Sequence, residues 1–98
     1  MAETIQEITV NYEDEGELKF EELDKVVLTK GVWSTILFRY RERDARTGKF
    51  GPPKATLRRY QKHQGAYKKR DAVNLTAITA KMLIATLQQW LDEELLGI

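Results

Sequence analysis

The chain contains no cysteine and only one histidine among its 98 residues. Without cysteine there is no disulfide, thiolate metal ligand or thiol nucleophile. The single histidine, His63, cannot build a cluster of histidine ligands by itself. A Walker-type or Gly-x-Gly-x-x-Gly phosphate-binding loop is also missing from the sequence. We therefore expect no metal, no cofactor and no enzymatic activity.

Long apolar runs are missing too. None of the hydrophobic stretches is long enough to cross a bilayer. The first ten residues include Glu3 and Glu7 and lack the basic region and apolar core of a signal peptide. The absence of cysteine fits a reducing compartment. We expect a cytoplasmic protein, associated with the nucleoid if it is bacterial, and no membrane partner.

The charge is unevenly distributed along the chain, although the net charge is only +1. Residues 1–24 contain nine acidic residues and one lysine, whereas residues 25–72 contain fourteen basic and three acidic residues. Residues 73–98 contain one lysine and three acidic residues. Segregated charge of this kind is informative about partners rather than about fold. It predicts an acidic front segment followed by a surface for an anionic partner.

Four β-prone segments follow one another between residues 26 and 75, and glycine or proline interrupts them. The breaks fall at Gly31, in the loop 45–53 with its two prolines, and at His63-Gln64-Gly65, which suits a hairpin turn. The expected strands are 26–28, 33–43, 55–62 and 66–75. Residues 1–24 read either as a loosely held acidic arm or as a short hairpin.

The last element is the clearest, because residues 77–96 carry apolar side chains at the spacing of a helical face. Thr76 or Asn74 can cap the helix at its start, and Gly97 follows its end. A second apolar group around Met82 predicts packing on the arm or contact with a second copy. The fold class is therefore α+β: an antiparallel four-stranded meander with an amphipathic C-terminal helix packed on one face (ββββα). Residues 25–98 form this domain.

Side chains alternate between the two faces of a strand. Each expected strand has a basic set and an apolar set to bury, such as Ile36, Phe38 and Tyr40 in 33–43 and Ala55 and Leu57 in 55–62. We expect the basic sets to share one face. Arg59 and Lys69 alternate onto the opposite face, which indicates either a bend or a β-bulge there. The candidate nucleic-acid-binding residues are Arg39, Arg41, Arg43, Arg46, Lys49, Lys54, Arg58, Tyr60, Lys62, Lys68 and Arg70.

A basic face of this kind suits a polyanion, because each neutralised phosphate releases condensed counterions. Tyr60 among the cations favours stacking on unpaired bases. Arginine outnumbers lysine in the segment 33–43, which suits bidentate contact with phosphate. We therefore expect a module that binds single-stranded nucleic acid with little sequence specificity. The choice between DNA and RNA stays open.

Three sequence features resemble the single-stranded-DNA-binding domain of the transcriptional positive cofactor family. They are the basic stretch 38–44, the turn 48–54 with its glycines and prolines, and the strand end 73–76 that leads into the terminal helix. The resemblance implies four strands and a helix, a homodimer formed through the helix and the sheet, and unpaired strands laid on a basic sheet. The contacts that it implies are Arg39, Arg41, Lys54, Arg58 and Tyr60.

Two other hypotheses are compatible with the charge pattern. The basic face could bind an acidic protein, or the acidic arm of one chain could bind the sheet of another. Within one chain, the same arm could fold back on the basic face and compete with a polyanion.

Overall fold

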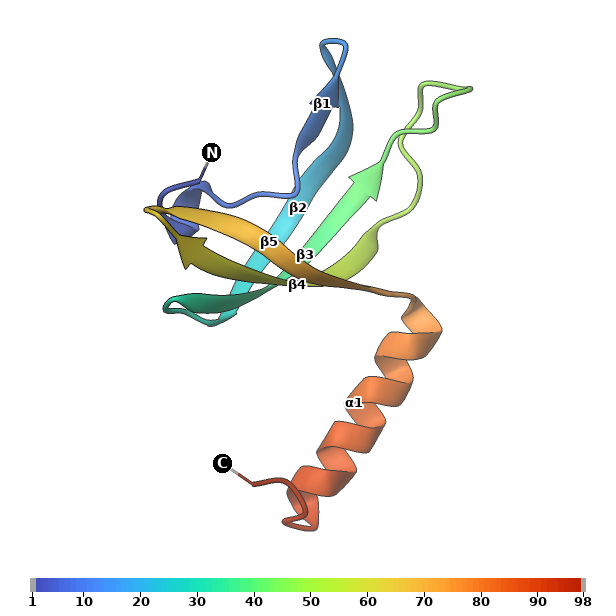
Figure 1. Cartoon of the computed structure of the whole chain (residues 1–98). Helices are drawn as coiled ribbons and strands as arrows, with labels where there is room; N and C mark the ends of the chain where they lie inside the picture. The colour runs from blue at the N-terminus through green and yellow to red at the C-terminus, as the bar shows by residue number, and fades with distance from the viewer. Residues whose placement is uncertain (1, 98) are drawn as a thin grey trace.

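The computed structural model describes residues 2–97. It contains one antiparallel sheet with the strand order β1-β2-β3-β4-β5, followed by a helix (Figure 1). The elements are the short 3-10 helix η1 (Ile5–Glu7), strands β1 (Tyr12–Asp14), β2 (Glu17–Thr29), β3 (Trp33–Glu42), β4 (Lys54–His63) and β5 (Ala66–Leu75), and helix α1 (Ala77–Asp92).

The predicted α+β class, with an antiparallel meander and a C-terminal helix, is confirmed. The sheet has five strands rather than four, because β1 and β2 form a hairpin in the acidic segment. Its turn is Glu15-Gly16, and both residues have positive φ, 53° and 78°. This is the conformation that a two-residue hairpin turn requires. Gln64-Gly65, with φ of 51° and 80°, makes the corresponding turn between β4 and β5.

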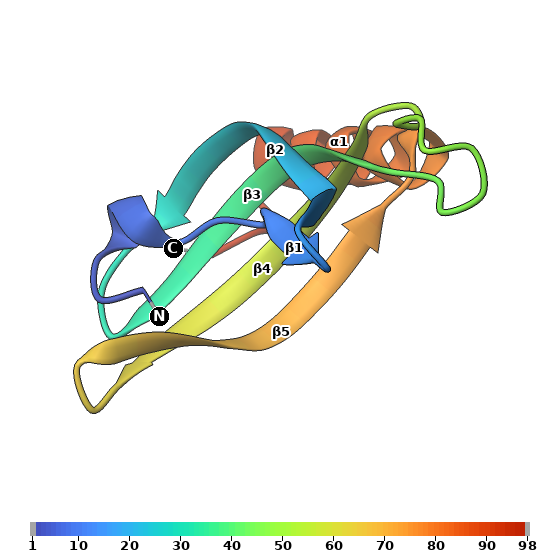
Figure 2. The same cartoon turned by 90° about the horizontal axis from the view of Figure 1, so that it is seen from above.

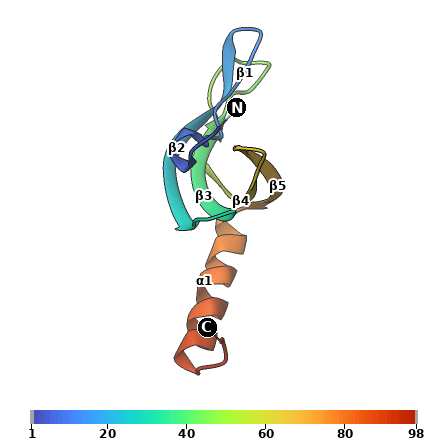
Figure 3. The same cartoon turned by 60° about the vertical axis from the view of Figure 1, so that its left-hand side comes forward.

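The sheet curls into a half-barrel, with β2 on one side and β5 on the other (Figure 3). Its concave face holds the core. Ile36 and Phe38 of β3 are completely buried there. Ile8 and Val10, from the N-terminal segment (residues 2–11), pack against them. Residues 2–11 are therefore packed on the core and do not form a loose arm.

One lysine holds this N-terminal segment in place. The ammonium group of Lys25 on β2 donates to the carbonyl oxygens of Ile5 and Ile8, both at 2.6 Å, and to that of Gln6 at 3.3 Å. The backbone N–H of Tyr67 donates to the carbonyl of Ala2 at 2.8 Å. The segment thereby connects β2 with β5 across the concave face.

The convex face of the sheet is different, because apolar residues there are left uncovered. Val26, Leu37, Leu57 and Val73 lie directly opposite one another on β2, β3, β4 and β5. Val26 and Val73 are exposed, and Leu37 and Leu57 are half-buried. We call these four residues the apolar row.

Helix α1 does not pack on a face of the sheet, contrary to the prediction. It projects away from the sheet (Figure 1), and none of its residues is buried. Thr76 caps the helix by accepting a hydrogen bond from the N–H of Thr79 at 3.1 Å, and it follows the last residue of β5 directly. No connecting loop separates the helix from β5. It also ends four residues earlier than expected, at Asp92 instead of position 96.

Candidate nucleic-acid interface

Two of the predicted arginines lie on the convex face, where acidic residues of β2 neutralise them. Arg39 forms an ion pair with Asp24, its partner across the strands, and Arg41 pairs with Glu21 at 2.6 Å. The acidic and basic segments of the sequence are thus adjacent antiparallel strands. A phosphate would have to compete with a carboxylate already in place at both arginines.

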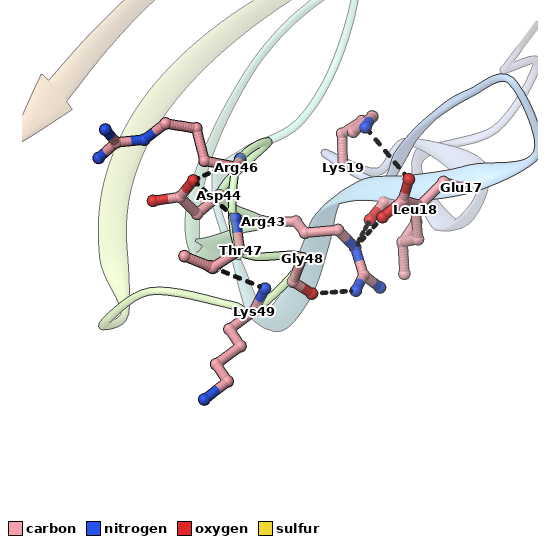
Figure 4. A network of polar contacts seen from close by, with 9 residues as sticks. All are labelled: Glu17, Leu18, Lys19, Arg43, Asp44, Arg46, Thr47, Gly48 and Lys49. Atoms are coloured by element: carbon pink, nitrogen blue, oxygen red, sulfur yellow. Dashed lines mark hydrogen bonds and ion pairs between the residues drawn. The ribbon is translucent and has the colours of Figure 1, made fainter.

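Arg43 is committed to the loop between β3 and β4 (Figure 4). Its guanidinium donates to the carbonyl oxygens of Leu18 at 2.9 Å and Gly48 at 2.6 Å, and it lies 3.1 Å from a carboxylate oxygen of Glu17. It also lies over the ring of Phe50, 4.3 Å from the centroid. Arg43 therefore holds the loop to the β1–β2 hairpin.

The other two predicted cations of this loop are oriented differently. The backbone N–H of Arg46 donates to Asp44 at 2.7 Å, and the backbone N–H of Lys49 donates to the Thr47 hydroxyl at 3.2 Å. The charged ends of both side chains point away from this network (Figure 4). Arg46 and Lys49 are thus exposed cations on a well-held loop.

Lys54 begins β4 and is paired with Glu42. Its ammonium group donates to the Glu42 carboxylate at 2.7 Å. This hydrogen bond, and the attraction between the two charges, raise the pKa of Lys54 above its usual value. Lys54 is therefore a neutralised cation, like Arg39 and Arg41.

The prediction that all basic sets share one face is wrong. Arg58 pairs with Ile36, and Tyr60 pairs with Ser34, so the side chains of Arg58 and Tyr60 lie on the concave face with the core. Tyr60 is only 6% exposed and packs in the core cluster. It is not available to stack on a base. Ala55 and Leu57, which were expected to be buried, alternate onto the convex face instead.

The basic residues without nearby acidic partners gather in the β4–β5 hairpin. Residues 58–70, which we call the basic hairpin, contain six cations and no acidic residue. Only Arg59 has an ion-pair partner among residues 2–97, namely Asp71 at 2.6 Å. The cations of the basic hairpin are Arg58, Arg59, Lys62, Lys68, Lys69 and Arg70.

A β-bulge determines which of these cations lie on the concave face of the sheet and which lie on the convex face. Arg59 pairs with Asp71 and the next residue, Tyr60, pairs with Lys69, so Arg70 is the extra residue. Lys69 therefore faces the concave side with Tyr60, and Lys68 faces the convex side with Gln61. Arg70 donates to the side chain of Gln61 at 3.0 Å. Either a bend or a bulge was expected here, because Arg59 and Lys69 broke the alternation. The structure has the bulge, with Arg59 on the convex face and Lys69 on the concave face.

Two aromatic residues that the sequence did not assign to the site lie beside the basic hairpin. Trp33 is opposite Gln61 on the convex face and is 44% exposed, and the guanidinium of Arg59 lies 4.5 Å from its ring centroid. Lys62 lies 5.5 Å from the ring centroid of Tyr67. The signal was present in the sequence, since Trp33 alternates onto the same face as Arg39 and Arg41.

The fold is a curled antiparallel half-barrel with a projecting helix (Figure 2). Its β4–β5 hairpin is basic and carries aromatic neighbours. Within residues 2–97, no helix has the length and apolar character needed to cross a membrane. Comparisons with family models, with curated proteins and with solved structures each returned no match for this chain.

Proposed function

We propose that the protein binds single-stranded nucleic acid, DNA or RNA, with little sequence specificity. The observation that carries the proposal is the basic hairpin, with six cations and no acidic residue in residues 58–70. Phosphate neutralisation by such a surface drives binding that is independent of sequence and weakens with salt. We expect no catalytic activity.

The preference for unpaired strands comes from Trp33. Its exposed ring lies in one row with Gln61 and Lys68 on the convex face. A base stacked on an aromatic ring contributes about 1–3 kcal/mol, and a duplex does not offer its bases in this way. Lys68 and Arg70 are the phosphate contacts nearest in register to this ring.

The proposed interface therefore shifts along the sheet from the arginines of β3 to the basic hairpin. Arg46 and Lys49 lie on the β3–β4 loop and serve as outlying phosphate contacts. Arg39, Arg41 and Lys54 contribute less, because each forms an ion pair with a carboxylate of this chain.

Fluorescence anisotropy with a labelled single strand of about 20 nucleotides and its duplex tests the proposal. Lys68→Gln/Arg70→Gln should weaken binding about tenfold or more at about 50 mM salt and reduce the salt dependence. Arg39→Gln/Arg41→Gln is the matched control, since it removes the same charge from the same face. We expect this control to bind nearly as well as the unmodified chain.

An equal loss of affinity in the two double variants would mean that only the total charge determines binding, and would contradict the assigned interface. Equal binding of strand and duplex, unaffected by Trp33→Ala, would contradict a stacking surface. No binding of either nucleic acid at low salt would favour the alternative, a basic face that binds an acidic protein.

The unpartnered helix supports a second proposal, that the protein is a homodimer. Ile78, Met82 and Ile84 are each more than 60% exposed on α1, and the apolar row is uncovered on the sheet. Exposed apolar surface on this scale typically marks an interface. A second copy presents the same helix and the same row, so a two-fold arrangement can cover both faces reciprocally.

Sedimentation velocity tests the dimer. Ile84→Lys should produce a species of one 11.4 kDa chain, whereas the unmodified protein should sediment with twice that mass. Because Ile84 is 68% exposed in the single chain, the substitution should not unfold it. Gln88→Lys adds the same charge to the polar stripe that Gln88 shares with Lys81 and Asp92, and it should leave the dimer intact. A monomeric unmodified protein at high concentration would refute the proposal.

A further inference from the structure

The open side of the half-barrel contains a pocket on the concave face of the sheet, opposite to the convex face that carries Trp33 and Lys68. It lies between the N-terminal segment and the concave face of β4 and β5, and its volume is about 260 Å³. Residues 9–12 and Phe20 line one side, and two cations, Arg58 and Lys69, line the other. At this size the pocket suits a small group rather than a large ligand.

The two cations lack an anionic partner. Neither Arg58 nor Lys69 forms an ion pair with a carboxylate within residues 2–97. The Nε atom of Arg58 is buried and has no hydrogen-bond partner. A buried donor that is left unpaired is costly. An anion bound in this pocket would satisfy that donor and neutralise both side chains.

The opposite wall has the groups that recognise a planar, polar ring. The side-chain oxygen of Asn11 accepts from the N–H of Glu22 at 2.6 Å, which leaves its NH₂ group to donate to a ligand. The rings of Tyr12 and Phe20 are 5.9 Å apart and tilted by 43°. Tyr12 is exposed. The hydroxyl of Thr9 is already used, since it donates to Glu22 at 2.7 Å.

We propose that this pocket binds one nucleotide unit, with the phosphate between Arg58 and Lys69 and the base against Tyr12 or Phe20. The unit is either a free nucleoside monophosphate or part of a bound strand. In the second case the inference rests on the proposed function, and it extends that function by adding a contact on the concave side of the basic hairpin.

Two neighbouring lysines provide a matched pair of variants. Lys69 lies opposite Tyr60 on the concave face, and Lys68 lies opposite Gln61 on the convex face. Lys69→Gln and Lys68→Gln remove the same charge from adjacent positions of one exposed strand. Titration calorimetry with AMP should show that Lys69→Gln weakens binding about tenfold. Lys68→Gln should leave AMP binding unchanged.

Arg58→Gln should abolish AMP binding, and its thermal unfolding must be measured because Arg58 is half-buried. If this variant does not fold, the comparison of Lys69→Gln with Lys68→Gln still tests whether AMP binds in the pocket. Chemical-shift mapping with AMP should perturb the amides of Asn11, Arg58 and Lys69. Perturbations confined to other residues would overturn the proposal.

Strand binding separates the two sources of the nucleotide. Strand binding needs a different control, because Lys68 is itself a proposed strand contact; Lys81→Gln removes the same charge from an exposed position on α1. If AMP does not bind but Lys69→Gln weakens strand binding more than Lys81→Gln does, the pocket holds part of a strand. If AMP binds through Lys69 and no strand binds, the pocket stands and the proposed function fails. Equal effects of Lys69→Gln and Lys68→Gln on AMP binding, equal effects of Lys69→Gln and Lys81→Gln on strand binding where AMP does not bind, or binding of neither ligand to the unmodified chain, would overturn the pocket.

Discussion

At the scale of single residues, Lys25 is the side chain that binds the N-terminal segment to β2. Its ammonium group donates to three carbonyl oxygens of the N-terminal segment. Hydrogen bonds that involve a charged group contribute about 1.5–3 kcal/mol. Lys25→Met should therefore lower the free energy of unfolding by about 2 kcal/mol, measured by urea denaturation. Lys30→Met, at an exposed position, should change it little, and equal effects would show that Lys25 does not hold the segment.

Lys54 gives a prediction about protonation. Because the hydrogen bond that Lys54 donates to Glu42 raises the pKa of Lys54, Glu42→Gln should lower this pKa towards its ordinary value of 10.5, as followed by NMR of the side chain. The raised pKa means that the pair contributes stability below pH 10.5 and loses it as the pH rises through the folded-state value. The contribution is small at this exposed position. An unchanged pKa in the variant would contradict the pairing.

Single residues also show where the sequence was sufficient and where it was not. Strict alternation in β3 predicted the burial of Ile36, Phe38 and Tyr40, because a strand with one apolar face has only one favourable orientation. In β4 the apolar residues Ala55 and Leu57 suggested the wrong face. The pairing of β4 with β3 fixes that face, and this partner register is not encoded within β4 itself.

At the scale of elements, β2 and β3 form a charge-neutralised pair. Glu21 and Asp24 on β2 bind Arg41 and Arg39 on β3. If the acidic segment competes with a polyanion, it does so at these two pairs. The carboxylates of β2 occupy the arginines of β3 that a phosphate would bind. Deleting residues 1–24 cannot test it, because the deletion would remove Ile8 and Val10 from the core.

Neutralising these carboxylates can test it. Glu21→Gln/Asp24→Asn should tighten strand binding about tenfold at low salt, because two arginines become available to phosphates. Glu13→Gln/Glu15→Gln removes the same charge at the exposed tip of the β1–β2 hairpin. Anisotropy should show a smaller gain for this control. If both pairs tighten binding equally, long-range charge rather than pairing with Arg39 and Arg41 is responsible.

The helix illustrates a different limit of sequence reading. Its periodicity predicted an element that begins at Ala77, as observed. The same apolar residues could equally cover the sheet of this chain or a surface of another. The direct junction of Leu75, Thr76 and Ala77 could be predicted from the sequence. The direction in which the helix leaves the sheet could not. The prediction of the candidate site had the same limit. The sequence showed its charged residues, but it did not show that carboxylates of β2 pair with Arg39 and Arg41.

At the scale of the whole molecule, the half-barrel fills its concave face with its own N-terminal segment and leaves its convex face and helix uncovered. The division predicts that folding and association are linked. In this proposal α1 and the apolar row are buried only in the dimer. A higher protein concentration favours the dimer and therefore stabilises the folded state.

The midpoint of thermal unfolding should therefore rise as the protein concentration is raised, which calorimetry can measure. Ile84→Lys should remove this dependence and lower the midpoint at high concentration, because the variant loses the apolar contact between copies. Gln88→Lys should keep the dependence, since it lies on the polar side of the helix. A midpoint independent of concentration in the unmodified protein, over a range in which sedimentation detects dimers, would mean that the helix contributes no stability by association. In that case the exposed side chains of α1 would have to be covered by a partner other than a second copy of this chain.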